Sequence, residues 1–413
     1  MQNELKRTRY LVIGILLLLA VVWSLASAGR GNAGGEYPRG DLLASAEWLH
    51  EHASDPDLVI LDVRRDKYFH GKVVPGAVRL PWSEFRYDSR TSGVGELFVG
   101  PDRAQEILGE HGIGRTDTIV VYDSVERDGG ATASYVFWVL DVLGHEKKRL
   151  LEGGIDAWER AGFDLDSTPK KLPPILYQAP TEAMVTDRWA DGRFVYQRLG
   201  DPFYQILDVR SPEEYLGQKG SKDLHGTPLK LGHIPTAVNI EYSQAWKDEE
   251  TKMLKPYSEL QELYRGLDPE KGLIVYCDSG RRGSFSYFVM RLMGFAHVAS
   301  YEASWKEWAH PTLYYPVETV ERTLAGTALP GASAGRAAGA TIQAGEESSA
   351  ASEPGGEPQG GYVSCGGGSC RKNGLRHLQN RPTGGGCPRP LPWPASSSSC
   401  SLPSALRPRQ AVS

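Results

Sequence analysis

The sequence predicts an α/β protein made of two copies of one domain, each a parallel sheet flanked by helices. Three observations support this fold class: an internal repeat, short apolar runs that suit buried strands, and helical stretches between those runs. The 413 residues are 40% hydrophobic and 23% charged, which is sufficient for two cores. The net charge of -5 shows no basic excess, so we expect no nucleic acid as a partner.

Four short motifs occur twice in the same order and define the repeat. A period this long is typical of a duplicated domain and not of a solenoid. We therefore predict a first domain over residues 41–165 and a second over residues 181–316, with extra residues in the second around Gly217 to Lys230. The motifs are Ile60 to Arg64, Val74 to Val78, Val120 to Asp123 and Glu152 to Trp158 in the first copy, and Ile206 to Arg210, Ile234 to Val238, Ile274 to Cys277 and Glu302 to Trp308 in the second.

Each copy alternates apolar strands with helical stretches. Continuous apolar runs are typical of strands that are buried on both faces of a parallel sheet. Ligands of such sheets bind at the carboxyl ends of the strands, and Cys277 lies between a predicted strand and a predicted helix, where a site is expected. The predicted strands are Leu58 to Leu61, Thr118 to Val121 and Leu273 to Tyr276, and the predicted helices are Ala44 to His52, Pro101 to His111, Ala131 to Leu143 and Ser284 to Met293.

The two ends of the chain differ from the repeat. Basic residues precede an uncharged run over residues 10–28 that ends in Ala26-Ser27-Ala28, a pattern typical of a cleaved secretory signal within residues 1–28. An uncleaved membrane anchor is the alternative, because the run approaches the length that a bilayer needs. Both interpretations predict an exported protein, periplasmic or otherwise extracytoplasmic. Gly, Ala, Ser, Pro and Glu dominate residues 319–413, which predicts a low-complexity tail without a core.

The distribution of the five cysteines separates one from the others. Cys277 lies in a segment expected to fold, whereas Cys365, Cys370, Cys387 and Cys400 lie in the tail, which excludes a disulfide framework in the core. Cys365 and Cys370 are open to several interpretations: acceptance of sulfur from Cys277, a soft-metal site, a disulfide after export, or an inert tail. For the two domains we expect no metal and no cofactor.

The residues that follow Cys277 favour an anion. Gly280 and Gly283 allow backbone amides to form a concave nest, two arginines add positive charge, and the next helix points its N-terminus at the same place. Such a setting favours a thiolate and holds an anionic substrate or a persulfide; the alternative is a buried structural cysteine beside solvated arginines. We predict Cys277 as the catalytic nucleophile and, as substrate-binding residues, Asp278, Ser279, Gly280, Arg281, Arg282 and Gly283.

Taken in order, the motifs resemble the two domains of rhodanese-type sulfurtransferases, which include thiosulfate and 3-mercaptopyruvate sulfurtransferases. The resemblance covers residues 41–316 and rests on four segments: Leu207 to Arg210, Gly232 to Pro235, the Cys277 loop and Tyr301 to Trp308. It implies that Cys277 takes a sulfane sulfur from a small anionic donor such as thiosulfate and passes it, from a persulfide, to a thiol or cyanide acceptor. It also implies an inactive first domain, where Asp123 stands at the position of the cysteine.

Two other functions stay open: a non-catalytic binding or sensor module of the same fold, and a phosphatase. Phosphatases of this fold place five residues between the cysteine and an arginine, whereas here Arg282 follows Cys277 after four, which is one residue short for a phosphate. The donor is open as well. Asp278 is unlike the basic neighbour of thiosulfate enzymes, while Ser279 agrees with mercaptopyruvate enzymes and the two arginines do not.

Asp208 and Arg210 end a strand near the loop and are predicted to support the site. A structural pair that ties the strand end to neighbouring turns is the favoured interpretation, because the first copy keeps the same pair as Asp62 and Arg64 without a cysteine. Lys222 and Lys230 are further candidates for substrate binding, with solvated lysines as the alternative.

Overall fold

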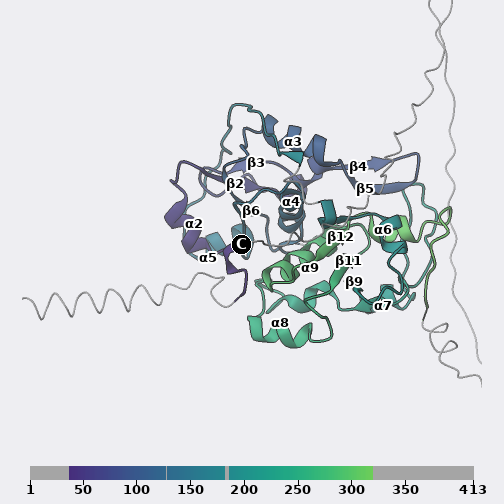
Figure 1. The fold of residues 1–413 in the computed structure, drawn as a ribbon. Helices are drawn as coiled ribbons and strands as arrows, with labels where there is room; N and C mark the ends of the chain where they lie inside the picture. Colours follow the sequence, from purple (N-terminus) through teal and green to yellow (C-terminus); the bar gives the residue numbers. More distant parts are fainter. Residues whose placement is uncertain (1–36, 127, 182–185, 320–413) are drawn as a thin grey trace, which may run out of the picture. The chain divides into compact units, whose positions relative to one another are not determined.

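The computed structural model describes residues 37–126, 128–181 and 186–319 (Figure 1). Both halves of the repeat belong to one compact unit. The predicted signal or anchor over residues 1–28, and the predicted tail beyond residue 319, lie outside the described residues. Among the residues that are described, no helix is long and apolar enough to span a membrane.

The first domain is built on a five-stranded parallel sheet with the spatial order β1-β7-β6-β2-β3. The central strands are the buried apolar runs that the sequence predicted. A separate antiparallel pair, β4 (Arg86–Ser89) and β5 (Val94–Phe98), follows the third strand. The sheet strands are β1 (Leu43–Ala44), β2 (Leu58–Asp62), β3 (Val78–Arg79), β6 (Thr118–Tyr122) and β7 (Lys148–Leu151), and the helices are α2 (Ala46–His52), α3 (Pro101–Glu110), α4 (Ala131–Val142) and α5 (Gly154–Arg160).

The second domain repeats this topology, with the parallel order β10-β9-β11-β12-β8. Tyr276 pairs with Asp208 in register as Tyr122 pairs with Asp62, which confirms the predicted duplication of a parallel α/β domain. The strands are β8 (Trp189–Ala190), β9 (Tyr204–Asp208), β10 (Val238–Asn239), β11 (Gly272–Tyr276) and β12 (Val298–Tyr301), and the helices are α6 (Gly192–Tyr196), α7 (Pro212–Tyr215), α8 (Tyr257–Leu263), α9 (Arg281–Leu292) and α10 (Ser304–Trp308). Short 3-10 helices are η1 (Gly40–Leu42), η2 (Asp66–Tyr68), η3 (Trp82–Phe85), η5 (Thr186–Arg188) and η6 (Tyr242–Ala245).

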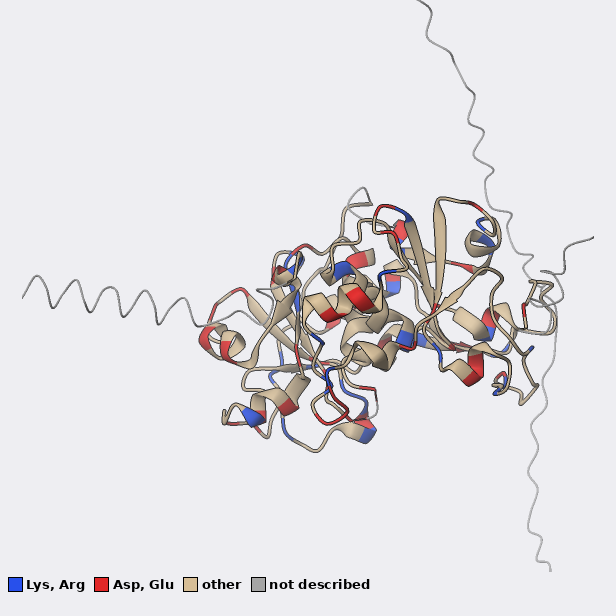
Figure 2. Ribbon diagram, turned by 90° about the horizontal axis from the view of Figure 1, so that it is seen from below, with Lys and Arg blue, Asp and Glu red and all other residues tan. Residues whose placement is uncertain are grey.

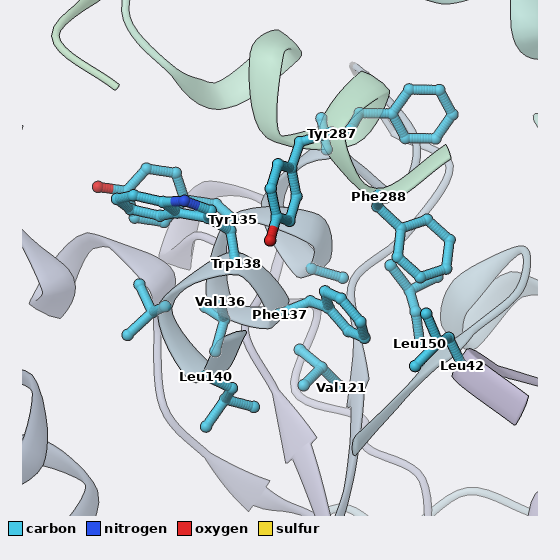
Figure 3. Packing of buried hydrophobic residues seen from close by; sticks show 14 of the residues in the cluster. Leu42, Val121, Tyr135, Val136, Phe137, Trp138, Leu140, Leu150, Tyr287 and Phe288 are labelled. Carbon is cyan, nitrogen blue, oxygen red and sulfur yellow. The ribbon is translucent and has the colours of Figure 1, made fainter. Parts of the chain in front are cut away.

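Helices α4 and α9 pack against each other and join the two domains (Figure 3). Both are buried along nearly their whole length. The ring of Phe137 meets that of Phe288 edge-on, with centroids 4.9 Å apart, and the hydroxyl of Tyr287 donates to Asp141 at 2.6 Å. One hydrophobic cluster includes residues of both domains, so the two halves share a core.

Charged residues are spread over both domains (Figure 2). In this view short blue (Lys, Arg) and red (Asp, Glu) segments are interspersed over the ribbon. This mixture agrees with the small net charge of the chain.

Helix α9 begins at Arg281, three residues before the predicted start at Ser284. Gly280 adopts a left-handed φ of 84° and ends the loop. The N–H of Ser284 donates to the carbonyl of Gly280 at 2.8 Å. Arg281, Arg282 and Gly283 therefore form the first helical turn. Gly283 is thus a helical residue, and its backbone N–H belongs to the first turn of α9.

Candidate active site

Cys277 follows the last residue of β11, at the carboxyl end of a central strand. It is the one cysteine in the part of the chain that the structure describes, it is free, and it is 1% exposed. Its N–H donates to the hydroxyl of Ser304 at 3.1 Å, and its carbonyl accepts the N–H of Trp305 at 3.1 Å. The start of α10 thus fixes the backbone that carries the thiol.

Ser304 supports the loop through its side chain. Its Oγ also accepts the N–H of Gly280, at 3.2 Å, and donates to the carbonyl of Tyr301 at 2.7 Å. Ser304 has a left-handed φ of 57°, which is uncommon for a residue other than glycine and costs free energy. The matching position of the first domain is Gly154, with a φ of 58°. A serine in a conformation that the other copy gives to glycine indicates that its hydroxyl is needed.

The first domain reaches the Cys277 loop through Arg86, at the start of β4. The guanidinium donates to the carbonyl of Ser279 at 2.5 Å and also to the carbonyl of Glu96. It lies over the rings of Trp82 and Tyr135, at 4.5 and 4.8 Å from the centroids. This cation is 4% exposed, so its position is fixed by its partners and not by water.

Glu302 is the buried acid that faces Arg86, at 3.4 Å. It accepts the N–H of Phe98 at 3.1 Å and the hydroxyl of Tyr135 at 2.9 Å, both from the first domain. Burial raises the pKa of Glu302 to about 7, and the charge of Arg86 opposes that rise. The loop therefore rests on a polar contact between the two domains.

Both arginines after Cys277 are paired with acids. Arg282 makes two hydrogen bonds to Glu214, at 2.7 and 2.9 Å. Burial alone would raise the pKa of Glu214, but the hydrogen bonds and charge of Arg282 lower it to about 2. Arg281 pairs with Asp128, which belongs to the first domain. Neither guanidinium is solvated, as the alternative of a structural cysteine beside solvated arginines would require.

A polar pocket of about 490 Å³ opens at this loop. Asp278 and Ser279 also contribute to it, while Cys277 itself is nearly buried. Asp278 accepts the hydroxyl of Ser221, a residue of the extra segment of the second domain, at 2.8 Å. The charged lining residues are five acids, Glu96, Asp128, Glu214, Glu241 and Asp278, and four bases, Lys219, Arg281, Arg282 and Lys306.

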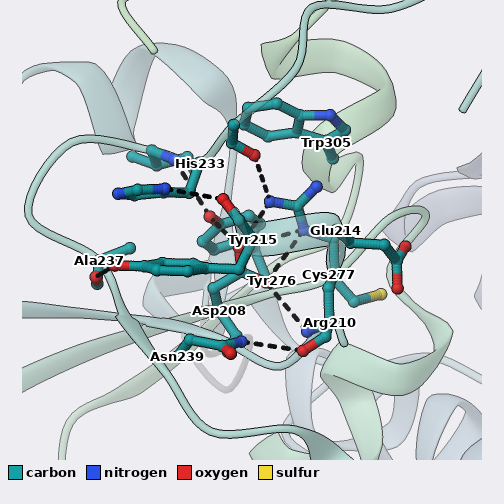
Figure 4. Close-up of polar contacts among 12 residues, drawn as sticks. Asp208, Arg210, Glu214, Tyr215, His233, Ala237, Asn239, Tyr276, Cys277 and Trp305 are labelled. Carbon is teal, nitrogen blue, oxygen red and sulfur yellow. Dashed lines mark hydrogen bonds and ion pairs between the residues drawn. The ribbon is translucent and has the colours of Figure 1, made fainter. Parts of the chain in front are cut away.

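Asp208 and Arg210 form a fully buried pair close to Cys277 (Figure 4). Arg210 donates to both carboxylate oxygens, at 2.7 Å to Oδ2 and 3.0 Å to Oδ1, and to the carbonyl of Gly232 at 2.8 Å. The hydroxyl of Tyr276 donates to Asp208 at 2.5 Å. The first domain repeats this pair in Asp62 and Arg64, which favours the structural interpretation.

The position of Cys277 is taken by a carboxylate in the first domain. Asp123 accepts three backbone N–H groups at the start of α4: that of Gly130 at 3.1 Å, and those of Thr132 and Ala133 at 3.0 Å each. Burial raises its pKa to about 6, against the effect of these three donors. The start of this helix thus binds an anion that the chain itself supplies.

Known proteins are similar to this chain in sequence. The family model described as a rhodanese-like domain matches residues 45–161 and 193–311. The thiosulfate sulfurtransferase of Corynebacterium glutamicum is 31% identical over 300 residues, covering 70% of this chain and 94% of that protein. The chain belongs to the rhodanese family. A further relative in this family, the sulfur carrier protein TtuD of Thermus thermophilus, is 30% identical over 281 residues, covering 66% of this chain and 95% of the relative.

Solved structures share the fold of this chain. The anaerobic ergothioneine biosynthesis enzyme from Chlorobium limicola superposes with a TM-score of 0.57 over 68% of this chain and 71% of that chain, at 23% identity. At this identity the likeness shows a shared fold alone.

The sequence did not predict three residues that contact the Cys277 loop from other segments of the chain: Arg86, Asp128 and Ser304. Only Ser304 left a signal, as the serine that replaces Gly154 of the other copy. Of the two lysine candidates, Lys230 donates to the carbonyls of Leu313 and Tyr315, at 2.5 and 3.1 Å. Neither Lys222 nor Lys230 lines the pocket, whose lysines are Lys219 and Lys306.

Proposed function

We propose that this protein is a sulfurtransferase that carries a sulfane sulfur as a persulfide on Cys277. The observation that carries the proposal is the internal comparison of the two loops. In the first domain, amides at the start of α4 bind the carboxylate of Asp123. In the second domain a thiol takes that position at the start of α9, where a helix N-terminus stabilises a thiolate.

The chemistry needs one attack on sulfur in each half-reaction. With thiosulfate, the Cys277 thiolate attacks the outer sulfur, the S–S bond breaks, and its electron pair leaves with sulfite. Cys277 is left as a persulfide anion. An acceptor then attacks the outer persulfide sulfur, and the S–S bond breaks so that the Cys277 thiolate is restored. Cyanide is converted to thiocyanate, and a thiolate acceptor is converted to a persulfide.

The residues around Cys277 have distinct expected roles in this cycle. The amides of Arg282 and Gly283 match those of Thr132 and Ala133, so we expect them to bind the charge of the thiolate and the persulfide. Ser304 positions the loop backbone. The names of the curated relatives, among them a thiosulfate sulfurtransferase and a sulfur carrier protein, support sulfur transfer, and thiosulfate is the first donor to test.

The test is sulfur loading followed by release. The purified protein is incubated with thiosulfate, and separately with 3-mercaptopyruvate, and its intact mass is measured. Cyanide is then added and thiocyanate is quantified. We expect a protein one sulfur atom heavier and thiocyanate formation, with both lost in Cys277→Ser. Cys387→Ser, from the tail, is the matched control and keeps both.

Two outcomes would contradict the proposal. If neither donor forms a persulfide on the protein, a non-catalytic binding module is favoured. Release of phosphate from aryl phosphates that depends on Cys277 would favour a phosphatase.

A further inference from the structure

The loop that carries no cysteine is the longer of the two. Asp123 lies seven positions before Gly130, the last residue before α4, whereas Cys277 lies three positions before Gly280, the last residue before α9. The longer loop contacts the second domain, because Lys252 donates to the carbonyl of Val125 at 2.7 Å. Its extra length is thus used at the domain boundary.

Asp128 is the described residue of this loop that lines the polar pocket at the Cys277 loop. Its carboxylate pairs with Arg281 and accepts the hydroxyl of Tyr242 at 3.2 Å. The side chains of Asp128 and Arg281 are 15% and 11% exposed. The guanidinium also lies 5.9 Å from the ring centroid of Trp82. Arg281 is therefore enclosed by residues of the first domain, where water screens the pair only weakly.

The charge balance of the pocket is unfavourable for a dianion. Among the described residues, its five acids outnumber its four bases, and three of the bases face a carboxylate of the same pocket. Arg282 is paired with Glu214, and Lys306 lies 3.4 Å from Glu96. A donor with two negative charges must compete with these carboxylates for three of the four cations.

We propose that Asp128 determines donor specificity: by neutralising Arg281, it weakens the binding of dianionic sulfur donors relative to monoanionic ones. The proposal rests on sulfur transfer at Cys277. Thiosulfate represents the dianions. 3-Mercaptopyruvate represents the monoanions; its C–S bond breaks, the sulfur passes to the Cys277 thiolate, and the carbon takes the thiol proton to leave pyruvate. The loop without a cysteine thus acts on the chemistry of the other domain.

The test is Asp128→Asn, which keeps the shape and an acceptor for Tyr242 but removes the charge. We expect the KM for thiosulfate to fall about three- to ten-fold, with kcat nearly unchanged, since one repulsive charge leaves the pocket. The KM for 3-mercaptopyruvate falls less, and the gain for thiosulfate shrinks as salt is added. Glu126→Gln is the matched control: it makes the same charge change in the same loop, outside the pocket, and leaves both KM values unchanged.

A binding measurement separates this proposal from the proposed function. Thiosulfate affinity is measured by calorimetry in Cys277→Ser, with and without Asp128→Asn, so that no turnover is required. Tighter binding with Asp128→Asn supports the specificity role even if the wild-type protein forms no persulfide. An unchanged or weaker affinity, or a loss of kcat with both donors together with reduced thermal stability, overturns it and leaves Asp128 a structural residue.

Discussion

Gly280 and Gly283 lie on either side of the two arginines and face different surroundings. Gly280 has a φ of 84°, and a Cβ there would lie 2.5 Å from the carbonyl oxygen of Glu302. At Gly283 the nearest atom to a Cβ would be the backbone nitrogen of Cys277, at 3.6 Å, an ordinary contact. The first glycine is required by the backbone, and the second is a helical residue with room for a methyl group.

This contrast gives a prediction for paired alanine substitutions. Gly280→Ala is expected to lower the free energy of unfolding by about 1–3 kcal/mol and to abolish thiocyanate formation, because the loop must shift. Gly283→Ala is expected to keep activity and to gain up to about 1 kcal/mol from helix propensity. Denaturant unfolding and a thiocyanate assay check both. Equal losses in the two variants would contradict the assignment of Gly283 to the helix.

At this scale the nucleophile could be predicted from the sequence, but the residues that hold its loop in place could not. Cys277 directly follows an apolar run, which predicts a buried strand, and the end of the run predicts where that strand ends. Arg86 and Asp128 precede it by more than a hundred residues, and a contact at that separation leaves no local pattern. The charge of the arginines was visible in the sequence, but their neutralisation was not. The Arg282–Glu214 pair depends on the packing of the second domain, and the Arg281–Asp128 pair on the packing of the two domains.

Among the elements, the hairpin of β4 and β5 acts as a support for the Cys277 loop. Arg86 begins this hairpin and bonds the carbonyls of both Glu96 and Ser279. We predict that Arg86→Lys keeps the charge that Glu302 requires but cannot span both carbonyls, so kcat falls roughly ten- to hundred-fold while the fold persists. Arg86→Met leaves Glu302 buried without its cation and lowers the free energy of unfolding by about 3–5 kcal/mol.

Steady-state kinetics and denaturant unfolding separate the two variants of Arg86. A Lys variant with wild-type kcat would show that the Cys277 loop does not need a side chain that donates to the carbonyls of both Glu96 and Ser279. A Met variant as stable as the wild type would show that Glu302 is adequately solvated without Arg86.

Elements with a strong period could be predicted well. Strands β2 and β6 each extend only one residue beyond the apolar run that predicted them. Helix α9 started earlier than predicted because the boundary is set by the φ of Gly280, and Arg281 and Arg282 are polar residues that the apolar pattern does not count. The hairpin of β4 and β5 could not be predicted, since its strands are short, β4 is polar and partly exposed, and neither strand carries a continuous apolar run.

For the molecule as a whole, two repeated acids join the domains. Glu302 accepts the N–H of Phe98 from the first domain, and its counterpart Glu152 accepts the N–H of Leu254 from the second at 3.0 Å. Burial raises the pKa of both to about 7. Each half thus places a carboxyl group in the interior of the joint molecule.

A pH dependence of stability follows for Glu152. Its pKa in the folded protein is about 7, above its ordinary value of 4.5. Between these pH values the folded state binds more protons than the unfolded state, so this group makes the free energy of unfolding fall as pH rises, by up to about 3 kcal/mol. In Glu152→Gln the side chain at this position cannot ionise, so its contribution does not change with pH. We expect the stability of this variant relative to the wild type to increase from pH 5 to pH 8.

Denaturant unfolding of both proteins at the two pH values checks this prediction. Glu126→Gln, which removes a half-exposed carboxylate, is the control and shows little change with pH relative to the wild type. A relative stability of Glu152→Gln that decreases over the same range would contradict the assigned direction.

The shared core of α4 and α9 has a consequence for recombination. A crossover between residues 165 and 181 divides the sequence at the repeat boundary, yet Phe137 and Phe288, which touch, would then come from different parents. The same exchange would place a foreign residue opposite Arg281. We expect shuffled genes of this family to yield folded protein mainly when both helices descend from one parent, so the two halves are inherited as a single unit although each is a complete repeat.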